Sequence, residues 1–470
     1  MIGKFIFVSL CLTVFVQLLL ASGSSTCKEQ IPAVGQKLFG LGCHNEKKRI
    51  DQLVGTIDAL KKVPAKDTIA DVENSLRRER ANNQELQVLV QKLIKKLELC
   101  DDKRKMFNNY VLESFLRNSP FSGVDNYTRY TVARLGMLPI KNAKPLIPKF
   151  GTVINDVLSF RYPINIPSCP AAEITNNTWS NPSVFIAIIS APEHFKERNN
   201  IRETWLIHLK SALEKNLLGI STRFGFFLGQ TRNDSIQKRI EEENQKHGDI
   251  VQIEMDDSYH NLTLKGIAML NWVRQQCASK VDLVFKVDDD VYVNVHNLVH
   301  FVRSNYQSNN SLFGYGNFGF YPIRMELGYA KDYAKWDMTF KEYPWSHYPN
   351  YVNGPAYFMH SSVVIPLLAA SQTTPLIPFE DVFLTGMCTE KAGVKMRYSA
   401  GTHSVFYRPL PTAPPPCDLR KFVGWPTDNQ FVTHSAVDDF YRNKTQCVVT
   451  ESDGTKKTID FTAPVVFKFT

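Results

Sequence analysis

The order of predicted elements indicates an α/β fold built on a mostly parallel sheet. Three observations support this: continuous apolar runs, helix-like segments between those runs, and ordinary globular composition, with 43% hydrophobic and 21% charged residues among 470. Continuous apolar runs are typical of strands buried on both faces, and strands alternating with helices favour helices on both sides of the sheet. Composition excludes wholesale disorder, a collagen-like repeat and a polytopic membrane protein.

The first 23 residues predict the compartment. An apolar run covers Phe5–Ala21, and Lys4 is the only charged residue before it. As a helix this run is about 26 Å long. It predicts either an uncleaved signal-anchor with a short cytosolic tail or a signal peptide cleaved near the small residues 21–23. Both alternatives send the rest of the chain into the secretory lumen.

Sequons and cysteines agree with a lumenal chain. Of nine cysteines, Cys11 lies inside the apolar run, and the other eight could form disulfides in an oxidising compartment. Their connectivity stays open, and no CxxC pair indicates a zinc or redox motif. Glycan acceptors are useful only in a lumenal chain. The six sequons begin at Asn126, Asn176, Asn233, Asn261, Asn309 and Asn443.

Residues 24–150 are predicted to form a helical stem. Apolar residues recur at steps of four and three from Leu86 to Val111, after a break in the helical pattern at Pro64. This spacing favours a short coiled coil that pairs two chains, with Cys100 available to bridge them. The alternative is a helix that packs on the body of its own chain.

A proline-rich segment follows the stem. Seven prolines lie between Pro139 and Pro182, and proline at this density stops helices and favours extended backbone. We therefore expect a linker over 151–182 and the main domain over 183–470. In that domain we expect strands at 184–190, 224–229, 250–255 and 282–287, with helices at 195–218, 235–246 and 261–277.

Three consecutive carboxylates, Asp288–Asp290, follow the fourth predicted strand. In open α/β sheets, ligands bind beyond the carboxyl ends of the strands. Adjacent carboxylates there repel one another, and a hard cation such as Mn²⁺ or Mg²⁺, itself holding a diphosphate, would offset the repulsion. The alternative is an acidic turn that faces solvent. Apolar residues on both sides of the cluster favour the metal site.

Two arginines follow the first predicted strand. Arg198 and Arg202 are four residues apart, so they lie on one face of a helix, with Trp205 one turn beyond. Two guanidiniums near a helix start suit a phosphate or nucleotide. The alternative is a surface ion-pair cluster with Glu197 and Glu203.

Three further segments carry candidate residues. Lys265 opens the helix after the third strand and could reach a phosphate, while Asn261 could cap that helix. Glu380 and Asp381 are paired carboxylates beside apolar residues, which suits general-base chemistry; the alternative is an acidic pair stabilised by a helix N-terminus. The aromatic segment 348–357 suits stacking on sugar rings or simple packing.

Five motifs in order resemble the β-1,3-galactosyltransferase and β-1,3-N-acetylglucosaminyltransferase family: ERNNIRETW, HNLTLKG, FKVDDDVYVN, YPNYVNGPAY and EDVF. The resemblance covers about 184 to 434. It implies a GT-A fold, which is an α/β nucleotide-sugar domain, with Mn²⁺ (or Mg²⁺) and a UDP-sugar donor. It also implies transfer to an acceptor glycan on protein or lipid, inverting the donor's α linkage to β. The short tail and apolar run resemble a Golgi type II membrane enzyme.

The resemblance gives expected roles to the acidic residues and a histidine. Asp290 matches the metal ligand of the family's DxD motif, and Asp288 faces the nucleotide. Asp381 matches the residue that looks like the catalytic base. His434 resembles a late histidine that completes the metal shell, with His403 as a competing candidate.

The expected nucleotide contacts come from basic residues and one further aspartate. Arg202 and Lys265 match positions near UDP, and we place Arg198 and Asp289 in the same cofactor-binding set. Galactose is the favoured sugar, although UDP-GalNAc or UDP-glucuronate would need only a few different pocket contacts.

A non-catalytic lumenal glycan-binding protein or chaperone on the same fold is the alternative to an enzyme. It predicts damaged acidic motifs, whereas both acidic motifs are intact here. The net charge of +9 is compatible with anionic partners such as nucleotides. That charge forms no stripe interleaved with aromatic residues, so nucleic acid is not an expected partner.

Overall fold

A computed structural model describes residues 120–171, 181–399, 404–406, 410–411 and 413–459, with six isolated positions before 120 and three after 459. The chain divides into two compact units, 1–108 and 109–470. The expected signal-anchor, Cys100 and most of the expected stem lie outside the described residues. Among the described helices, none is long and apolar enough to cross a membrane.

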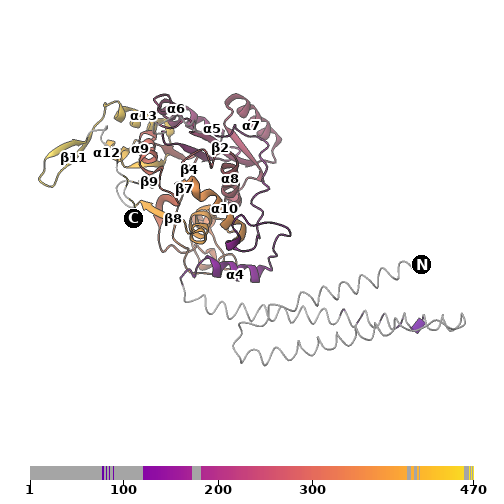
Figure 1. Cartoon of the computed structure of the whole chain (residues 1–470). Helices are drawn as coiled ribbons and strands as arrows, with labels where there is room; N and C mark the ends of the chain where they lie inside the picture. Colours follow the sequence, from indigo (N-terminus) through magenta and orange to yellow (C-terminus); the bar gives the residue numbers. More distant parts are fainter. Residues whose placement is uncertain are drawn as a thin grey trace. The chain divides into compact units, whose positions relative to one another are not determined.

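The second unit contains a seven-stranded sheet in the order β3-β2-β1-β4-β7-β6-β8 (Figure 1). Only β7 runs against its neighbours, because it pairs antiparallel with both β4 and β6. The mixed α/β fold with a parallel-rich sheet is therefore confirmed. The strands are β1 Val184–Ile189, β2 Arg223–Gln230, β3 Ile250–Asp256, β4 Leu283–Asp288, β6 Ser311–Asn317, β7 Tyr351–His360 and β8 Lys395–Ser399.

Helices cover both faces of this sheet. Alternate residues of β1 enter different cores: Phe185 and Ala187 belong to one hydrophobic cluster, and Ile186 and Ile188 to the other. Both clusters exclude water, which explains why β1 is apolar throughout. The longer helices are α4 Val124–Leu135, α5 Phe195–Glu203, α6 Trp205–Glu214, α7 Asp234–His247, α8 Leu262–Gln276, α9 Val295–Asn305, α10 Val364–Thr373 and α13 Gln430–Tyr441.

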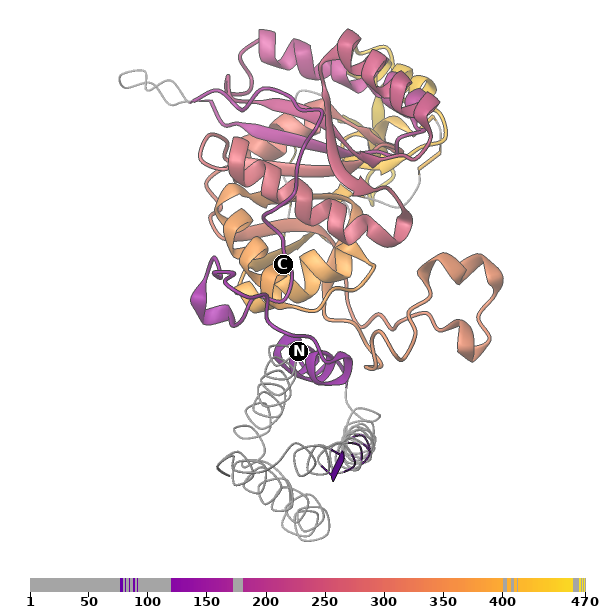
Figure 2. The same ribbon diagram turned by 90° about the vertical axis from the view of Figure 1, so that its right-hand side faces the viewer.

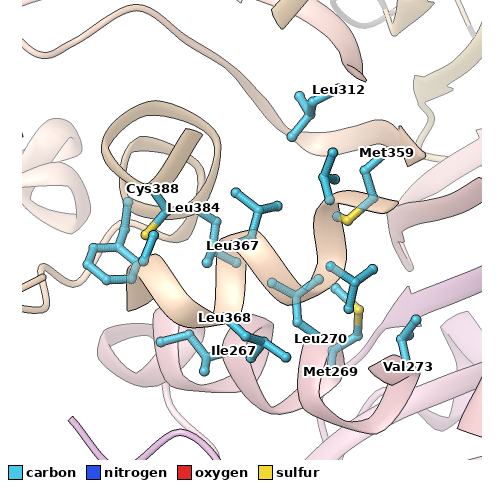
Figure 3. Packing of buried hydrophobic residues seen from close by; sticks show 14 of the residues in the cluster. Ile267, Met269, Leu270, Val273, Leu312, Met359, Leu367, Leu368, Leu384 and Cys388 are labelled. Atoms are coloured by element: carbon cyan, nitrogen blue, oxygen red, sulfur yellow. The ribbon is translucent and has the colours of Figure 1, made fainter. Parts of the chain in front are cut away.

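The first cluster packs α8 against α10. This cluster contains Ile267, Leu270 and Val273 of α8 and Leu367 and Leu368 of α10, and Figure 3 shows Ile267 beside Leu368. All five side chains are fully buried, and burying each contributes about 1.5–3 kcal/mol to folding. This packing holds α8 beneath the sheet and so fixes the position of Lys265 near its start.

The expected helix over 195–218 is two helices. α5 ends at Glu203 and α6 begins at Trp205, with Thr204 between them at φ −120° and ψ −110°. The Thr204 hydroxyl donates to the backbone oxygen of Asn200 at 2.6 Å, a kind of bond that often accompanies a bend in a helix.

The prediction of a linker over 151–182 needs correction, because much of this segment is part of the folded body. Val157, Ile166 and Cys169 lie in the first hydrophobic cluster, and Cys169 forms a disulfide with Cys277. The prolines do keep this segment extended, but its backbone pairs with the edge of β3 at Ile164. α4, inside the expected stem, also packs on the same cluster.

Smaller elements complete the body. A three-stranded sheet joins β5 Val291–Val293, β10 Phe422–Pro426 and β9 Ser404–Phe406, and a hairpin joins β11 Cys447–Thr450 to β12 Lys456–Ile459. A second disulfide, Cys417–Cys447, ties α12 Pro416–Leu419 to that hairpin. The remaining helices are η1 Pro148–Phe150, η2 Tyr259–Asn261, η3 Met325–Leu327, η4 Lys331–Trp336, η5 Ser361–Val363, the π-helix η6 Asp381–Cys388 and α11 Thr389–Ala392.

Candidate active site

A cavity of about 1110 Å³ lies at the carboxyl ends of β1 to β4. Its wall combines the segments after these strands with the start of β7 and the start of η6. This is the position that open α/β sheets use for ligands. Of the predicted residues, five line the cavity: Lys265, Asp288, Asp289, Asp290 and Asp381. Arg198, Arg202 and His434 are not among the lining residues.

Lys286 is a buried cation in the cavity wall. Its Nζ donates to Asp288 Oδ1 at 2.6 Å and to the Gly354 backbone oxygen at 2.7 Å, and it lies 3.8 Å from Glu380 Oε2. Burial lowers the pKa of Lys286, but Asp288 and Glu380 more than compensate and raise it to about 12. Lys286 therefore stays charged and links β4 to β7 and η6.

The three aspartates after β4 have different surroundings. Burial, with the charges of Asp290 and Glu380, raises the pKa of Asp288 to about 7 despite its bond to Lys286. Asp289 is buried and bonds His194 Nδ1 at 2.9 Å, which raises the pKa of that histidine. The Asp290 side chain is exposed to the cavity, but the surrounding protein still removes part of its hydration. This desolvation, together with the charge of Asp289, raises the pKa of Asp290.

Asp381 begins the π-helix η6 and faces the same cavity. The Val382 backbone N–H donates to Asp381 Oδ1 at 2.8 Å. Burial and the charge of Glu380 raise the pKa of Asp381 to about 6. π-helical turns are rare and often occur at functional sites. A carboxyl with this pKa is ionised at neutral pH and is a stronger base than an ordinary aspartate.

Glu380, the partner of Asp381, is held in the protein interior. Its Oε1 accepts a short hydrogen bond from the Tyr357 hydroxyl, and it is 8% exposed. Gly266 of α8 makes room for it, because a Cβ there would lie 2.8 Å from Glu380 Cγ. Glu380 thus supports the wall of the cavity, while Asp381 is the carboxylate presented beside it.

Lys265 is buried at the start of α8 and reaches the loop after β1. Its Nζ donates to the Ser190 backbone oxygen at 3.0 Å and to Asp257 Oδ1 at 2.7 Å. Asp257 in turn accepts from the Gly229 backbone N–H at 2.6 Å. Lys265 therefore joins the ends of three strands, and it is also one of the cavity-lining residues.

The expected nucleotide contacts of Arg198 and Arg202 are corrected by the structure. Arg198 is fully buried and pairs with Glu243, with Nη2 and Oε2 2.7 Å apart. It also donates to the backbone oxygen of Ala191 at 2.6 Å. Arg202 bonds both oxygens of Asp249, at 2.7 and 2.8 Å. Both guanidiniums are already used by buried carboxylates, and Arg198 holds the loop that lines the cavity.

His434 is also absent from the cavity lining, and its hydrogen-bond and ring contacts are with residues other than the three aspartates. Its Nδ1 is 3.0 Å from the Tyr292 hydroxyl, and its ring centroid lies 4.4 Å from that of His208. Burial and His208 lower the pKa of His434 to about 4. This corrects the expectation that His434 completes a metal shell. The competing candidate, His403, lies outside the described residues.

The acidic side chains of the cavity fit a divalent cation that shares its ligands with substrate. Within the described part of the chain, no three His, Cys, Asp or Glu side chains converge on one point. Mg²⁺ and similar ions are commonly held by one or two carboxylates plus substrate phosphates. Asp290, with its oxygens exposed in the cavity and Asp288 two residues away, provides such a set.

Sequence reasoning missed Lys286 and Asp257, and it identified Tyr357 only as part of an aromatic segment, without its bond to Glu380. One pattern could have indicated Lys286: a lone lysine inside an otherwise apolar strand, two residues before an aspartate cluster, has to be buried with a carboxylate. Asp257 and Tyr357 had no comparable pattern, because their partners lie on other elements of the fold.

Comparisons with known proteins identify the family of this chain. The galactosyltransferase family model matches residues 196–399, which contain the lining residues named above except Ser190, Ala191 and His194. The β-1,3-galactosyltransferase 5 of Pan paniscus is 30% identical over 215 residues, 46% of this chain and 67% of its own. Lactosylceramide 1,3-N-acetyl-β-D-glucosaminyltransferase of Xenopus tropicalis is 30% identical over 260 residues, 53% of this chain and 64% of its own.

These matches define a glycosyltransferase. The chain belongs to the galactosyltransferase family, together with β-1,3-galactosyltransferases and β-1,3-N-acetylglucosaminyltransferases. Among solved structures, the mannosyltransferase Ktr4p from S. cerevisiae in complex with GDP aligns over 60% of this chain and 80% of its own, at 9% identity and a TM-score of 0.20. That similarity is too low to bear on fold or function.

Proposed function

We propose that this protein is an inverting glycosyltransferase with a GT-A domain. It moves a hexose or N-acetylhexosamine, with galactose favoured, from a UDP-sugar to a glycan hydroxyl in β-1,3 linkage. One observation carries the proposal: Asp290 and Asp381, from distant parts of the sequence, face one cavity at the strand ends. The alternative is a non-catalytic glycan-binding protein. A screen of the lumenal protein against UDP-sugars and acceptor glycans separates the two, since only the enzyme releases UDP and extends an acceptor.

The donor occupies the side of the cavity formed by the ends of β1, β3 and β4. Asp290, with Asp288 beside it, would hold Mn²⁺ or Mg²⁺ against the diphosphate. When bound, the ion supplies positive charge that stabilises the UDP leaving group. Lys265 adds a fixed cation on the same wall, held by Asp257 at 2.7 Å. Fixed charges of this kind need no reorganisation as the leaving group develops charge.

Asp381 acts as the general base on the opposite wall. A sugar hydroxyl is a weak nucleophile, and a carboxylate within hydrogen-bond reach takes its proton as it attacks the anomeric carbon. One base and one displacement invert that carbon, without a covalent sugar–enzyme intermediate. Lys286 holds the backbone oxygen of Gly354, beside Asp381, and so keeps the base in position.

We infer a Golgi location for the full chain. The N-terminal apolar run would anchor it as a single-pass type II membrane protein with the catalytic domain in the lumen. The stem would pair two chains. Two disulfides in the described residues, Cys169–Cys277 and Cys417–Cys447, support an oxidising compartment.

Removal of divalent cations should abolish transfer. The side chains of the cavity bring two carboxylates toward the donor, and without a cation these repel a diphosphate. We expect no product in EDTA and recovery on adding Mn²⁺. The substitution Asp290→Asn should weaken the apparent affinity for Mn²⁺, measured from rate against metal concentration. Asp439→Asn, which breaks a surface pair with Lys444, is the matched control. Full activity in EDTA would exclude the proposed metal.

Turnover should fall as the pH drops through about 6. The Asp381 carboxyl must be ionised to accept a proton, and its pKa is raised to about 6. Below that pH the protonated fraction grows, so kcat should decline about tenfold per pH unit. Profiles of kcat against pH, taken at saturating donor, check this. A rate that stays constant from pH 7 to pH 5 would contradict the assignment of Asp381 as base.

A further inference from the structure

A segment of 33 residues, 318–350, connects β6 to β7 and extends from the body as the coral-coloured coil in Figure 2. It contains six of the eight exposed aromatic side chains among the described residues; the other two are Tyr259 and Phe431. Exposed apolar surface concentrated in one place indicates an interaction site. The six are Phe318, Phe320, Tyr321, Tyr333, Trp336 and Phe340.

The base of this β6–β7 segment is rigid. Arg324 is 3% exposed and donates to the backbone oxygens of Tyr343 at 2.6 Å and Trp345 at 2.9 Å. The Trp345 ring in turn lies 5.6 Å from the rings of Tyr127 and Tyr130 on α4. The exposed rings are therefore carried on a fixed support and need little ordering when a ligand binds.

Some of these rings, together with the half-buried Tyr329, form a row along the rim of the cavity. Trp336 lines the cavity and hydrogen-bonds with Tyr259 on the segment after β3. The Tyr333 ring lies 6.0 Å from that of Trp336, and the Tyr329 ring lies 6.4 Å from that of Tyr333. Tyr321, also in the cavity wall, hydrogen-bonds with Tyr329 and closes the row.

Other aromatic residues of the same cavity lie near the proposed base. Tyr348 and Tyr351 line the cavity, and the charge of Asp381 acts on both hydroxyls. Two amides, Asn317 and Asn353, line the same region and hydrogen-bond to each other at 2.5 Å. Aromatic faces beside amides and a carboxylate match a ligand with apolar C–H faces and many hydroxyls, whereas a purely apolar ligand would leave the polar groups unpaired.

We propose that the row Trp336–Tyr333–Tyr329 is an extended acceptor subsite that binds the sugars of a glycan chain beyond the one being glycosylated. This rests on the proposed transferase function, which places the acceptor hydroxyl at Asp381. The reacting sugar sits at Asp381, and the following sugars stack along the row. The protein therefore selects an oligosaccharide acceptor over the corresponding monosaccharide.

The test compares a methyl monosaccharide, the methyl tetrasaccharide that ends in the same sugar, and the octyl monosaccharide. Binding is measured by calorimetry on the full-length protein with UDP and Mn²⁺ present, and kcat/KM is measured with the UDP-sugar. The variants Tyr333→Ala and Trp336→Ala remove one ring each. Tyr333→Phe and Trp336→Phe keep a ring, and Phe431→Ala, an exposed ring on α13 outside the cavity, is the control.

We expect the wild-type protein to bind the tetrasaccharide more tightly than the monosaccharide. Each alanine variant should lose about 2- to 10-fold in tetrasaccharide affinity, the range for one aromatic contact. Monosaccharide affinity should fall less. The phenylalanine variants and Phe431→Ala should retain the preference for length. If an alanine variant does not unfold cooperatively, Tyr321→Ala replaces it as the variant that loses a ring. The phenylalanine variant at the affected position then serves as the control that keeps its ring.

Two results would overturn the proposal. One is equal affinity of the wild-type protein for the two methyl glycosides. The other result concerns the alanine variants. If they no longer bound the octyl monosaccharide more tightly than the methyl monosaccharide, but still preferred the tetrasaccharide, the row would be a site for a lipid chain. Binding and turnover test the subsite and the transferase function separately. Tetrasaccharide binding along the row without any transfer supports the subsite and refutes the transferase function. Transfer with no preference for a longer acceptor supports the transferase function and refutes the subsite.

Discussion

Replacing Asp381 with asparagine should reduce kcat by about 10²–10⁴-fold, the usual loss for a general base. Asparagine keeps the size of the side chain and can still accept the hydrogen bond from the Val382 N–H, which is 2.8 Å long in the wild-type protein. It cannot take a proton from a sugar hydroxyl. UDP affinity should survive because the donor contacts lie on other strands, so calorimetry with UDP and single-turnover kinetics should separate binding from chemistry.

Asp439→Asn, the same substitution on the surface, should leave turnover unchanged. Near wild-type turnover of Asp381→Asn would refute the assignment and make Glu380 the next candidate. Loss of UDP affinity with little change in the chemical step would instead make Asp381 a residue of the nucleotide site.

Replacing Arg198 with methionine should lower the free energy of unfolding by about 3–5 kcal/mol, the range for breaking a buried ion pair. Methionine fills most of the volume but leaves Glu243 without one of its two arginines, and it removes the donors to the loop after β1. Chemical denaturation followed by fluorescence measures the change.

Arg442→Met provides the matched control for this substitution. Arg442 is 66% exposed and pairs with Asp438 one helical turn away, so its loss should cost less than about 1 kcal/mol. If Arg198→Met were as stable as the wild-type protein but bound UDP weakly, the nucleotide contact first expected of Arg198 would be restored.

Much of the fold could be predicted because the strands are buried on both faces. The four parallel strands β1 to β4 lie within one or two residues of the predicted ranges, and α7 and α8 do as well. The break at Thr204 was missed because threonine also occurs inside helices, and no glycine or proline marks the break in this stretch. The packing of 151–171 on the body was missed because proline spacing indicates extended backbone and says nothing about which surface that backbone covers.

The site was predictable where adjacent residues share one chemical role, as in Asp288–Asp290 and Asp381. It was not predictable where a charge has its partner on another element. Arg198 and Arg202 look like free cations in sequence, but Glu243 and Asp249 reach them from α7 and the start of β3. His434 was misplaced for a similar reason, since its neighbours Tyr292 and His208 come from β5 and α6.

The Cys169–Cys277 disulfide separates the residues of the catalytic cavity into two groups, one inside the loop that it closes and one outside. It closes a loop of sequence separation 108 that contains β1 to β3 and α8, with Lys265 and Asp257 inside it and Lys286, Asp290 and Asp381 outside. A closure of this length restricts the unfolded chain by about 4–5 kcal/mol in the chain-entropy model. All residues of that loop leave the ribosome before β4, so the part of the donor wall that carries Lys265 and Asp257 can form and be locked covalently first, and Asp290 is added when β4 pairs with β1. The base joins it only when β7 pairs with β4, a contact of long sequence separation that forms slowly.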